Sequence, residues 1–310
     1  MGDSVEFDVV VVGSCNLDPV STTTHLPMPG ETVRAIAYAE HAGGKGLNQA
    51  VACARMGARV AFIGCVGNDS AGTMLRELLE SEGIDTTQLR TVDAPTGRAF
   101  ITVDANGENT IVIVAGANAH LGDTTITVPR TKVLLTQLEI PLPVVTDVLT
   151  QARLQTSVTV LNPAPATALT KELLSLCDIA VPNQTESAEL GGTQVLLGAG
   201  VNTVITTLGE QGAEISDATS TTPIAPHKVD AIDTVGAGDS FLATLIVRLL
   251  RGKSPQKSLN YACAVGALVA GHEGANPKIS EKEIAKFMML ILDNGRRPII
   301  CLLRVDIPKQ

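Results

Sequence analysis

The chain has 310 residues, of which 45% are hydrophobic and 18% are charged, the composition of a globular protein with a large buried core. Its net charge of −9 argues against a nucleic-acid partner, because binding to phosphate backbones depends on Lys and Arg. Aromatic residues make up only 2% of the chain and Trp is absent, which argues against a site that stacks bases on rings.

The six cysteines stand singly in apolar stretches, and the sequence has no C-x-x-C and no His pair at metal spacing. We therefore expect buried free thiols in a reducing compartment and no zinc site. The N-terminus is acidic and leads directly into an apolar run, and no apolar run reaches the roughly 18 residues of a membrane span. These features predict a cytoplasmic protein without a signal peptide or membrane contact.

Short apolar runs rich in β-branched residues recur along the chain, beginning with FDVVVV at 7–12. Such runs are typical of strands buried on both faces of a parallel sheet. The later runs lie at 60–64, 133–138, 158–161, 179–181 and 204–207. Helical patterns accompany them at 47–56, 71–82, 142–152, 169–176, 237–250 and 255–271. This alternation predicts an α/β fold with a three-layer α/β/α, Rossmann-like core around a mostly parallel sheet.

One stretch interrupts the alternation. The sequence GRAFITVDANGENTIVIVAG at 97–116 has two alternating runs around Asn106-Gly107, which is a strong hairpin signal. Residues 26–39 also have an extended pattern, with turn signals among them. We expect segments 15–42 and 97–115 to form a small sheet that acts as a lid over the carboxyl ends of the parallel strands. The exposed edge of this sheet favours a homodimer formed through the lid.

Two motifs near the N-terminus offer groups that bind hydroxyls. GSCNLD at 13–18 follows the first predicted strand and presents Asn16 and Asp18, although an Asx turn would explain the same residues. GGKGLNQAV at 43–51 leads into a helix, so Lys45 and Asn48 would point toward whatever is bound there. The alternative is that these glycines serve only close packing of the helix on the sheet.

Three motifs in the second half indicate phosphate chemistry. PNQTE at 182–186 places Asn183 and Glu186 one helical turn apart, which suits Mg²⁺ but also matches a helix capping box. TTLGEQG at 206–212 is a strand followed by a glycine turn that could contact a nucleotide. DTVGAGDS at 233–240 places Asp239 in the first turn of a predicted helix, where backbone N–H groups attract anions. On its own, Asp239 could simply stabilise the helix dipole.

Taken together, these segments resemble the ribokinase family of carbohydrate kinases over about residues 8–278. The motifs that carry the resemblance are GSCNLD with PGET (29–32), GGKGLNQAV, IVIVAGAN (111–118), QLE (137–139), NPAPA (162–166), PNQTE, TTLGEQG and DTVGAGDS. The resemblance implies a single kinase domain over 1–310 that transfers a phosphoryl group from ATP to the primary 5-hydroxyl of ribose. Ribose and ATP would be its small-molecule partners, with Mg²⁺ and K⁺ as cofactors.

The resemblance also implies a role for each matched residue. Asp239 would be the base that takes the proton of the attacking hydroxyl, and Gly236, Ala237 and Gly238 would form the anion hole. The sugar would be bound by Asn16, Leu17, Asp18, Gly44, Lys45, Gly46, Asn48 and Glu139. The nucleotide would be bound by Asn183, Thr207, Leu208, Gly209, Glu210, Gln211, Gly212 and Gly238. Mg²⁺ would be held by Glu186, and K⁺ by Asp233, Val235, Ala270, Glu273 and Gly274.

The chain departs from the family pattern in several places. Segments 118–132 and 189–204 are short for the family, and the second leaves little more than two helical turns where a full helix is expected. Residues 287–310 form a divergent tail without resemblance. Lys278 stands where the family has a small residue, and its ammonium either fills the K⁺ site or extends into solvent. Two other functions stay open: a kinase for another sugar or nucleoside, and an inactive sugar-binding relative.

Overall fold

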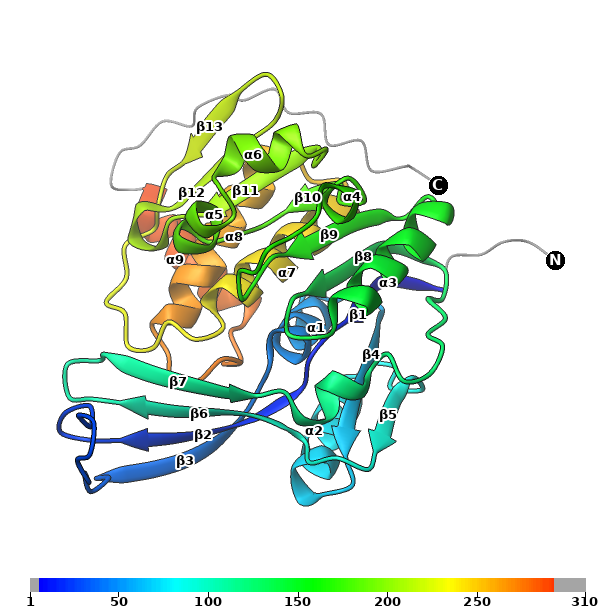
Figure 1. Cartoon of the computed structure of the whole chain (residues 1–310). Helices are drawn as coiled ribbons and strands as arrows, with labels where there is room; N and C mark the ends of the chain where they lie inside the picture. The colour runs from blue at the N-terminus through cyan, green and yellow to red at the C-terminus, as the bar shows by residue number, and fades with distance from the viewer. Residues whose placement is uncertain (1–5, 293–310) are drawn as a thin grey trace.

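The core of the protein is a nine-stranded sheet with the order β13-β12-β11-β10-β9-β8-β1-β4-β5 (Figure 1). The computed structural model describes residues 6–292. The strands are β1 (Phe7–Val12), β4 (Val60–Gly67), β5 (Leu89–Val92), β8 (Thr131–Gln137), β9 (Val158–Asn162), β10 (Ile179–Ala180), β11 (Thr203–Thr207), β12 (Ala213–Ser216) and β13 (Thr221–Ile224). The pairs β11–β12 and β12–β13 at one edge are antiparallel, and the other described pairs of this sheet are parallel.

Helices cover both faces of this sheet. One face carries α1 (Lys45–Arg55), α2 (Ser70–Ser81), α7 (Ala237–Leu250) and α8 (Pro255–Ala270), and the other carries α3 (Leu142–Leu154), α4 (Lys171–Leu174) and α6 (Thr193–Gly198). Strand β1 shows how the sequence produces this, since Val9 and Val11 belong to the first core and Val10 and Val12 to the second. Alternate side chains of a strand point to opposite faces, so an apolar run is buried on both. The predicted three-layer α/β/α core is confirmed.

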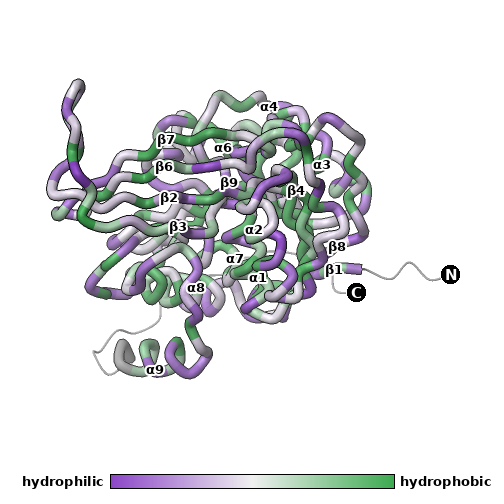
Figure 2. The backbone as a smooth tube through the Cα atoms, turned by 90° about the horizontal axis from the view of Figure 1, so that it is seen from below, coloured by the Kyte–Doolittle hydropathy of each residue, from purple (hydrophilic) through white to green (hydrophobic). Residues whose placement is uncertain are grey.

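A second, four-stranded sheet stands to one side of the core, in the order β3-β2-β6-β7 (Figures 1 and 2). Its strands are β2 (Asn16–Thr22), β3 (Ala37–Gly43), β6 (Gly97–Val103) and β7 (Asn109–Val114). The hairpin predicted around Asn106-Gly107 is present as β6 and β7. The extended structure predicted for 26–39 is mostly absent, because β3 begins only at Ala37 and the chain before it bends and turns. This small sheet, β2, β3, β6 and β7, is called the lid below.

Other elements differ from the predictions in local ways. The predicted helix 169–176 is reduced to α4, because the Thr170 side chain accepts a hydrogen bond from the Leu173 N–H and so begins the helix two residues later. The short strands β5, β12 and β13, of which β5 and β13 are the sheet edges, are absent from the sequence prediction, since each has only four residues with mixed polarity. Segment 189–204 contains the six-residue α6, and 118–132 contains the end of the 3-10 helix η1 (Gly116–His120).

The end of the described chain is the helix α9 (Glu281–Leu292), which packs on α8 through a small cluster that includes Val265 and Ile284. Residues 287–292 of the divergent tail therefore continue α9, and residues 293–310 lie outside the described residues. Five of the six cysteines fall within the described residues, where all five are buried free thiols. Between residues 6 and 292, no helix is both long and apolar enough to cross a membrane.

Candidate active site

A cleft of about 1290 Å³ opens between the lid and the edge of the core where the parallel strands end. The lid contributes apolar side chains, the start of α1 contributes Lys45 and Asn48, and the start of α7 contributes Asp239. Most of the predicted site residues line this one cleft: Asn16, Asp18, Gly44, Lys45, Asn48, Glu139, Asn183, Glu186, Thr207, Gly209, Glu210, Gln211, Gly212, Val235, Gly236, Ala237, Gly238, Asp239 and Ala270. Segments far apart in the sequence therefore meet at one site.

The glycine turn before α7 has a defined geometry. Gly236 is the N-cap residue and has a φ of 75°, in the left-handed region that favours glycine. A Cβ atom at this position would lie 2.1 Å from the carbonyl oxygen of Ala275, so the neighbouring loop also requires glycine. Gly238 is different, because it is exposed to the cleft and a Cβ atom there would meet no atom within 4 Å. Helix α7 thus presents its open N-terminus to the cleft.

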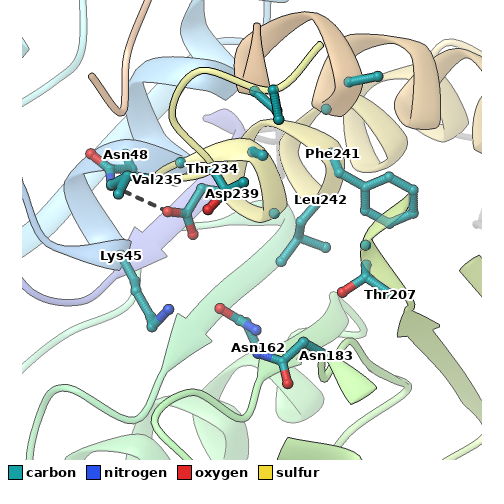
Figure 3. A pocket seen from close by; sticks show the side chains of 18 of the residues that line it. Lys45, Asn48, Asn162, Asn183, Thr207, Thr234, Val235, Asp239, Phe241 and Leu242 are labelled. Carbon is teal, nitrogen blue, oxygen red and sulfur yellow. Dashed lines mark hydrogen bonds between the residues drawn. The ribbon is translucent and has the colours of Figure 1, made fainter. Parts of the chain in front are cut away.

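Asp239 lies in the first turn of α7 and is 9% exposed. Its two carboxylate oxygens each accept a hydrogen bond from α1. The Asn48 Nδ2 atom lies 3.2 Å from Oδ2, and the Gln49 Nε2 atom lies 2.7 Å from Oδ1. Both donors are neutral amides, so they hold the carboxylate without cancelling its charge. Figure 3 shows Asp239 and Lys45 at the same open space as Asn162, Asn183 and Thr207.

Asp18 forms the end of the cleft beneath the lid. It is 8% exposed, and its Oδ1 atom is buried without a hydrogen-bond partner. Burial, together with the nearby charge of Glu139, raises the pKa of Asp18 to about 7. Gly43 leaves the space for this side chain, because a Cβ at position 43 would lie 1.8 Å from the Asp18 Oδ2 atom. Such an unsatisfied buried acceptor suits a ligand that donates hydrogen bonds.

Glu139 and Lys45 connect the lid end with the centre of the cleft. The Glu139 Oε2 atom accepts hydrogen bonds from the Ser14 hydroxyl at 2.5 Å and from the Lys45 backbone N–H at 3.0 Å. Burial acts to lower the pKa of the Lys45 ammonium, but the charges of Asp239, Glu139 and Glu186 outweigh it and raise that pKa. Lys45 therefore stays a cation among three carboxylates, in the position where an anionic ligand would meet it.

The far end of the cleft is formed by the loops after β10 and β11. Asn183 and Glu186 form a capping box at the start of α5 (Gln184–Glu189), with the Asn183 Oδ1 atom and the Glu186 Oε2 atom each 2.8 Å from the other residue's backbone N. The structural alternative for PNQTE is thus correct, and both residues line the cleft as well. Burial raises the pKa of Glu186. Phe241, Leu242 and Cys263 add an apolar wall at this end.

The remaining predicted residues lie behind the lining. Asp233 closes two turns, because its oxygens accept the backbone N–H groups of Val235 at 2.9 Å and Gly274 at 3.0 Å. The carbonyl oxygen of Ala270 accepts two backbone N–H groups, from Ile232 and Asp233. Six predicted residues are not among those that line the cleft: Leu17, Gly46, Leu208, Asp233, Glu273 and Gly274. Across residues 6–292, no cluster of three or more His, Cys, Asp or Glu is arranged to hold a metal ion.

Sequence reasoning missed several residues that the structure brings to the site. Gln49 contacts Asp239 directly, Asn162 lines the cleft, and the Asn276 Nδ2 atom lies 2.6 Å from the Asn48 Oδ1 atom. Gln49 and Asn162 lie inside two quoted motifs, GGKGLNQAV and NPAPA, so a signal was present. Asn276 had no such signal, since its contact depends on how the loop after α8 returns to α1.

Comparisons with known proteins agree with this geometry. A model of the pfkB family of carbohydrate kinases matches residues 6–282. A ribokinase from Haemophilus influenzae is 39% identical over 293 residues, which is 89% of this chain and 96% of that protein. A crystal structure of ribokinase from Thermotoga maritima has a TM-score of 0.83 at 34% identity, covering 91% of this chain and 99% of that one. A structure of Arabidopsis thaliana ribokinase complexed with ribose and ATP has a TM-score of 0.81 at 29% identity, covering 91% and 98%.

Proposed function

Because the chain belongs to the pfkB family of carbohydrate kinases, we propose that it catalyses the ATP-dependent phosphorylation of ribose at the primary 5-hydroxyl. The observation that carries this proposal is Asp239, a buried carboxylate at the open N-terminus of α7, in the same cleft as the hydroxyl-binding groups around Asp18. The similarity to ribokinases over most of the chain, including one complexed with ribose and ATP, supports ribose as the acceptor.

The sugar is bound at the lid end. Asp18 offers an oxygen without a partner, and Asn16, Lys45, Asn48 and Glu139 surround the same space. Carboxylate and amide oxygens accept hydrogen bonds from neighbouring hydroxyls, which is the chemistry that a pentose presents. Apolar side chains of the lid, Ala99 and Ile101 among them, cover the opposite side. The acceptor hydroxyl is thereby directed toward Asp239.

Phosphoryl transfer requires mainly positioning and charge stabilisation. Asp239 accepts the proton of the attacking hydroxyl, and the N–H groups of Gly236 and Gly238 would face the charge that develops on the phosphoryl oxygens. The N–H group of Ala237, the third predicted member of the anion hole, donates to the Thr234 carbonyl oxygen at 3.3 Å. The α7 dipole adds a fixed positive field at the same place. Lys45 supplies a positive charge from the other side of the cleft. The proposed base and the proposed anion hole thus lie in the same turn at the start of α7, which accounts for a carboxylate directly after the glycines.

The nucleotide lies along the loops at the far end, against Asn183 and the segment Thr207–Gly212. That segment includes Leu208, Gly209, Glu210 and Gln211, and the lining here includes the apolar side chains of Phe241 and Leu242. Glu186 lies on the lining with a partly buried carboxylate, a ligand type that suits Mg²⁺ held largely through water and phosphate. Mg²⁺ supplies neutralisation of the phosphate charge during transfer.

We assign the K⁺ site to the loops behind the anion hole. Asp233 provides a carboxylate there, and Val235, Glu273 and Gly274 provide backbone carbonyls. Ala270 fits this role poorly, because its carbonyl oxygen already accepts two backbone hydrogen bonds. Lys278 is exposed, and its charge adds to the hydrogen bond from Arg55, the main cause of the lowered pKa of Glu82, so its ammonium extends toward the surface rather than into this site. A K⁺ ion supplies positive charge beside Asp233.

We also propose a homodimer formed through the lid. β3 and β7 are its two edge strands, and its face away from the cleft exposes Tyr38, Phe100 and Val112, whose exposed fractions are 61%, 46% and 63%. Exposed apolar side chains beside open strand edges are typical of an association surface. Light scattering of the wild type and of Val112→Lys tests this, since the charge should convert a dimer into monomers.

The proposed activity is tested with a coupled ADP-release assay. Ribose should give the highest kcat/KM in a panel that also contains 2-deoxyribose, fructose and adenosine. A clear preference for fructose or adenosine would instead assign the chain to another activity of the same family. No ADP release with any acceptor, together with measurable ribose binding by calorimetry, would identify an inactive sugar-binding relative.

A further inference from the structure

Gln49 and Gln137 form a fully buried pair of side-chain amides between the core sheet and Asp239. Both side chains are 0% exposed. The Gln137 Nε2 atom, at the end of β8, lies 2.6 Å from the Gln49 Oε1 atom. The Gln49 Nε2 atom then donates to Asp239 Oδ1 at 2.7 Å and to Asn162 Oδ1 at 3.0 Å. A chain of hydrogen bonds thus runs from the rigid sheet to the carboxylate that we propose as the base.

Each polar group of the Gln49 side chain has a hydrogen-bond partner in this arrangement. An amide side chain has two N–H donors and one carbonyl oxygen, and all three groups of Gln49 have partners. Leaving such a group unpaired in a buried position would be unfavourable, so the arrangement resists rotation of the side chain. The neighbouring Asn162 is held as well, because its Nδ2 atom donates to the carbonyl oxygen of Val181 at 2.7 Å.

The direction of the Gln49 amide follows from its neighbours. If the amide were reversed, its oxygen would face both the Asp239 Oδ1 and the Asn162 Oδ1 at hydrogen-bond distance, and its NH₂ group would face the Gln137 NH₂ group. Both contacts would be repulsive. Asp239 and Asn162 therefore set the direction of the Gln49 amide, and the Gln137 N–H group, whose own Oε1 atom is buried without a partner, anchors the oxygen of that amide to the sheet.

We infer that Gln49 is a positioning residue for Asp239 and that Gln137 anchors its amide oxygen to the sheet. The inference rests on the proposed function, because it takes Asp239 as the base. Gln49 itself does not line the cleft, and it reaches the lining through its hydrogen bonds to Asp239 and Asn162, so it acts on the base through Asp239. With Asn48 on the other oxygen, it fixes the plane of the carboxylate, so that the base is aligned before the acceptor hydroxyl arrives.

The test compares Gln49→Met and Gln137→Met, which keep the length of the side chain and remove the amide. Gln49→Met should lower kcat by about 10- to 100-fold, and Gln137→Met by about threefold to tenfold. The KM values for ribose and ATP should stay within about twofold of wild type. The double variant should have the same kcat as Gln49→Met, because Gln137 acts on Asp239 only through Gln49.

The control is Thr136→Val, a nearly isosteric change at the neighbouring, equally buried position of β8, whose hydroxyl has no hydrogen-bond partner. It should leave kcat unchanged. Calorimetry with ribose should give about one binding site per chain for each variant, whereas a merely structural role of the amides would reduce this number. If Gln49→Met does not fold, Gln137→Met alone decides, since a kcat within twofold of the control would overturn the inference.

The outcomes separate this inference from the proposed function. A Gln49→Met enzyme with wild-type kcat would overturn the positioning role and leave the activity intact. If the kcat losses of the two single variants multiply in the double variant, Gln137 does not act through Gln49. By contrast, an Asp239→Asn variant that turns over normally would show that the base itself is misassigned.

Discussion

The variant Gly238→Ala tests whether glycine at the start of α7 is needed for folding or for binding of phosphate. In the folded protein, a Cβ atom at position 238 would meet no atom within 4 Å, and Gly238 lies in the first turn of α7 outside the left-handed region. Alanine in a helix is favoured over glycine by about 0.5–1 kcal/mol. We therefore expect the variant to be as stable as wild type or more so, with a Tm higher by about 1–3 °C.

Activity should change in the opposite direction. The added methyl group projects into the cleft where the transferring phosphoryl group would approach the N–H groups of α7. The variant keeps the backbone N–H, but a methyl group that holds the phosphate away from it would act like the loss of a donor, which in an anion hole lowers catalysis by about 100- to 1000-fold. We therefore expect kcat/KM for ATP to fall by about 100-fold. Thermal unfolding and the coupled ADP-release assay measure the two effects on the same preparation.

Gly236→Ala is the matched control. It inserts the same methyl group two residues earlier, where φ is 75° and the Ala275 carbonyl oxygen lies 2.1 Å away, so it should lower the Tm as well as the activity. A Gly238→Ala enzyme with wild-type kcat/KM would refute the idea that phosphate approaches this turn. A marked loss of stability in Gly238→Ala would refute the packing argument instead.

Three further changes test the remaining assignments. Asp239→Asn should abolish ADP release while calorimetry still detects ribose, because the amide has the shape of the carboxylate but cannot accept the proton. Burial and the charge of Glu139 raise the pKa of Asp18 from 3.8 to about 7, so folding of the wild type without ligand should weaken by about 2–4 kcal/mol between pH 4 and pH 7 and then level off. Asp18→Asn should remove this decline in the free energy of unfolding, measured by chemical denaturation, and should weaken ribose binding by about 1.5–3 kcal/mol. An unchanged decline would exclude Asp18 as its source. Rates in potassium chloride should exceed those in sodium chloride for the wild type and, by the same ratio, for Lys278→Ser, because the Lys278 side chain extends to the surface, whereas equal rates in the two salts for both proteins would contradict a K⁺ site.

The sequence predicts the core of the fold well because buried parallel strands carry a strong signal. Runs such as 7–12 must be apolar on both faces, and the helices between them are amphipathic, so each element is recognisable alone. The short strands β12 and β13 escape prediction, because each has only four residues and mixes polar with apolar side chains, so neither is long enough for a clear alternating pattern. Residues 26–36 show the opposite error. Their extended pattern predicts a strand, but they form none, because no neighbouring strand pairs with them.

The sequence predicts those residues of the candidate site whose side chains are themselves charged. Asp18, Lys45 and Asp239 are charged groups inside glycine-rich motifs, and the structure places all three in one cleft. Residues that contact another side chain rather than a ligand are not revealed by their type, even where, like Gln49, they lie inside a motif. Gln49 looks like an ordinary polar position of a helix until α7 brings Asp239 within 2.7 Å of it, and Asn276 reaches Asn48 only through the return of a loop.

The glycines of GGKGLNQAV and of DTVGAGDS are required for different physical reasons, so their substitution should have different effects. Gly43 makes room for the Asp18 carboxylate, and Gly46 lets α1 approach the backbone of Gly13 and Ser14, where a Cβ would lie within 2.8 Å. These two act by packing, so substitution should first disturb the local structure that holds the sugar end. Gly238 has no such neighbour, but it lines the cleft, so the proposed approach of a phosphate would account for glycine at this position. If so, substitution of Gly238 should act on catalysis and leave the local structure intact.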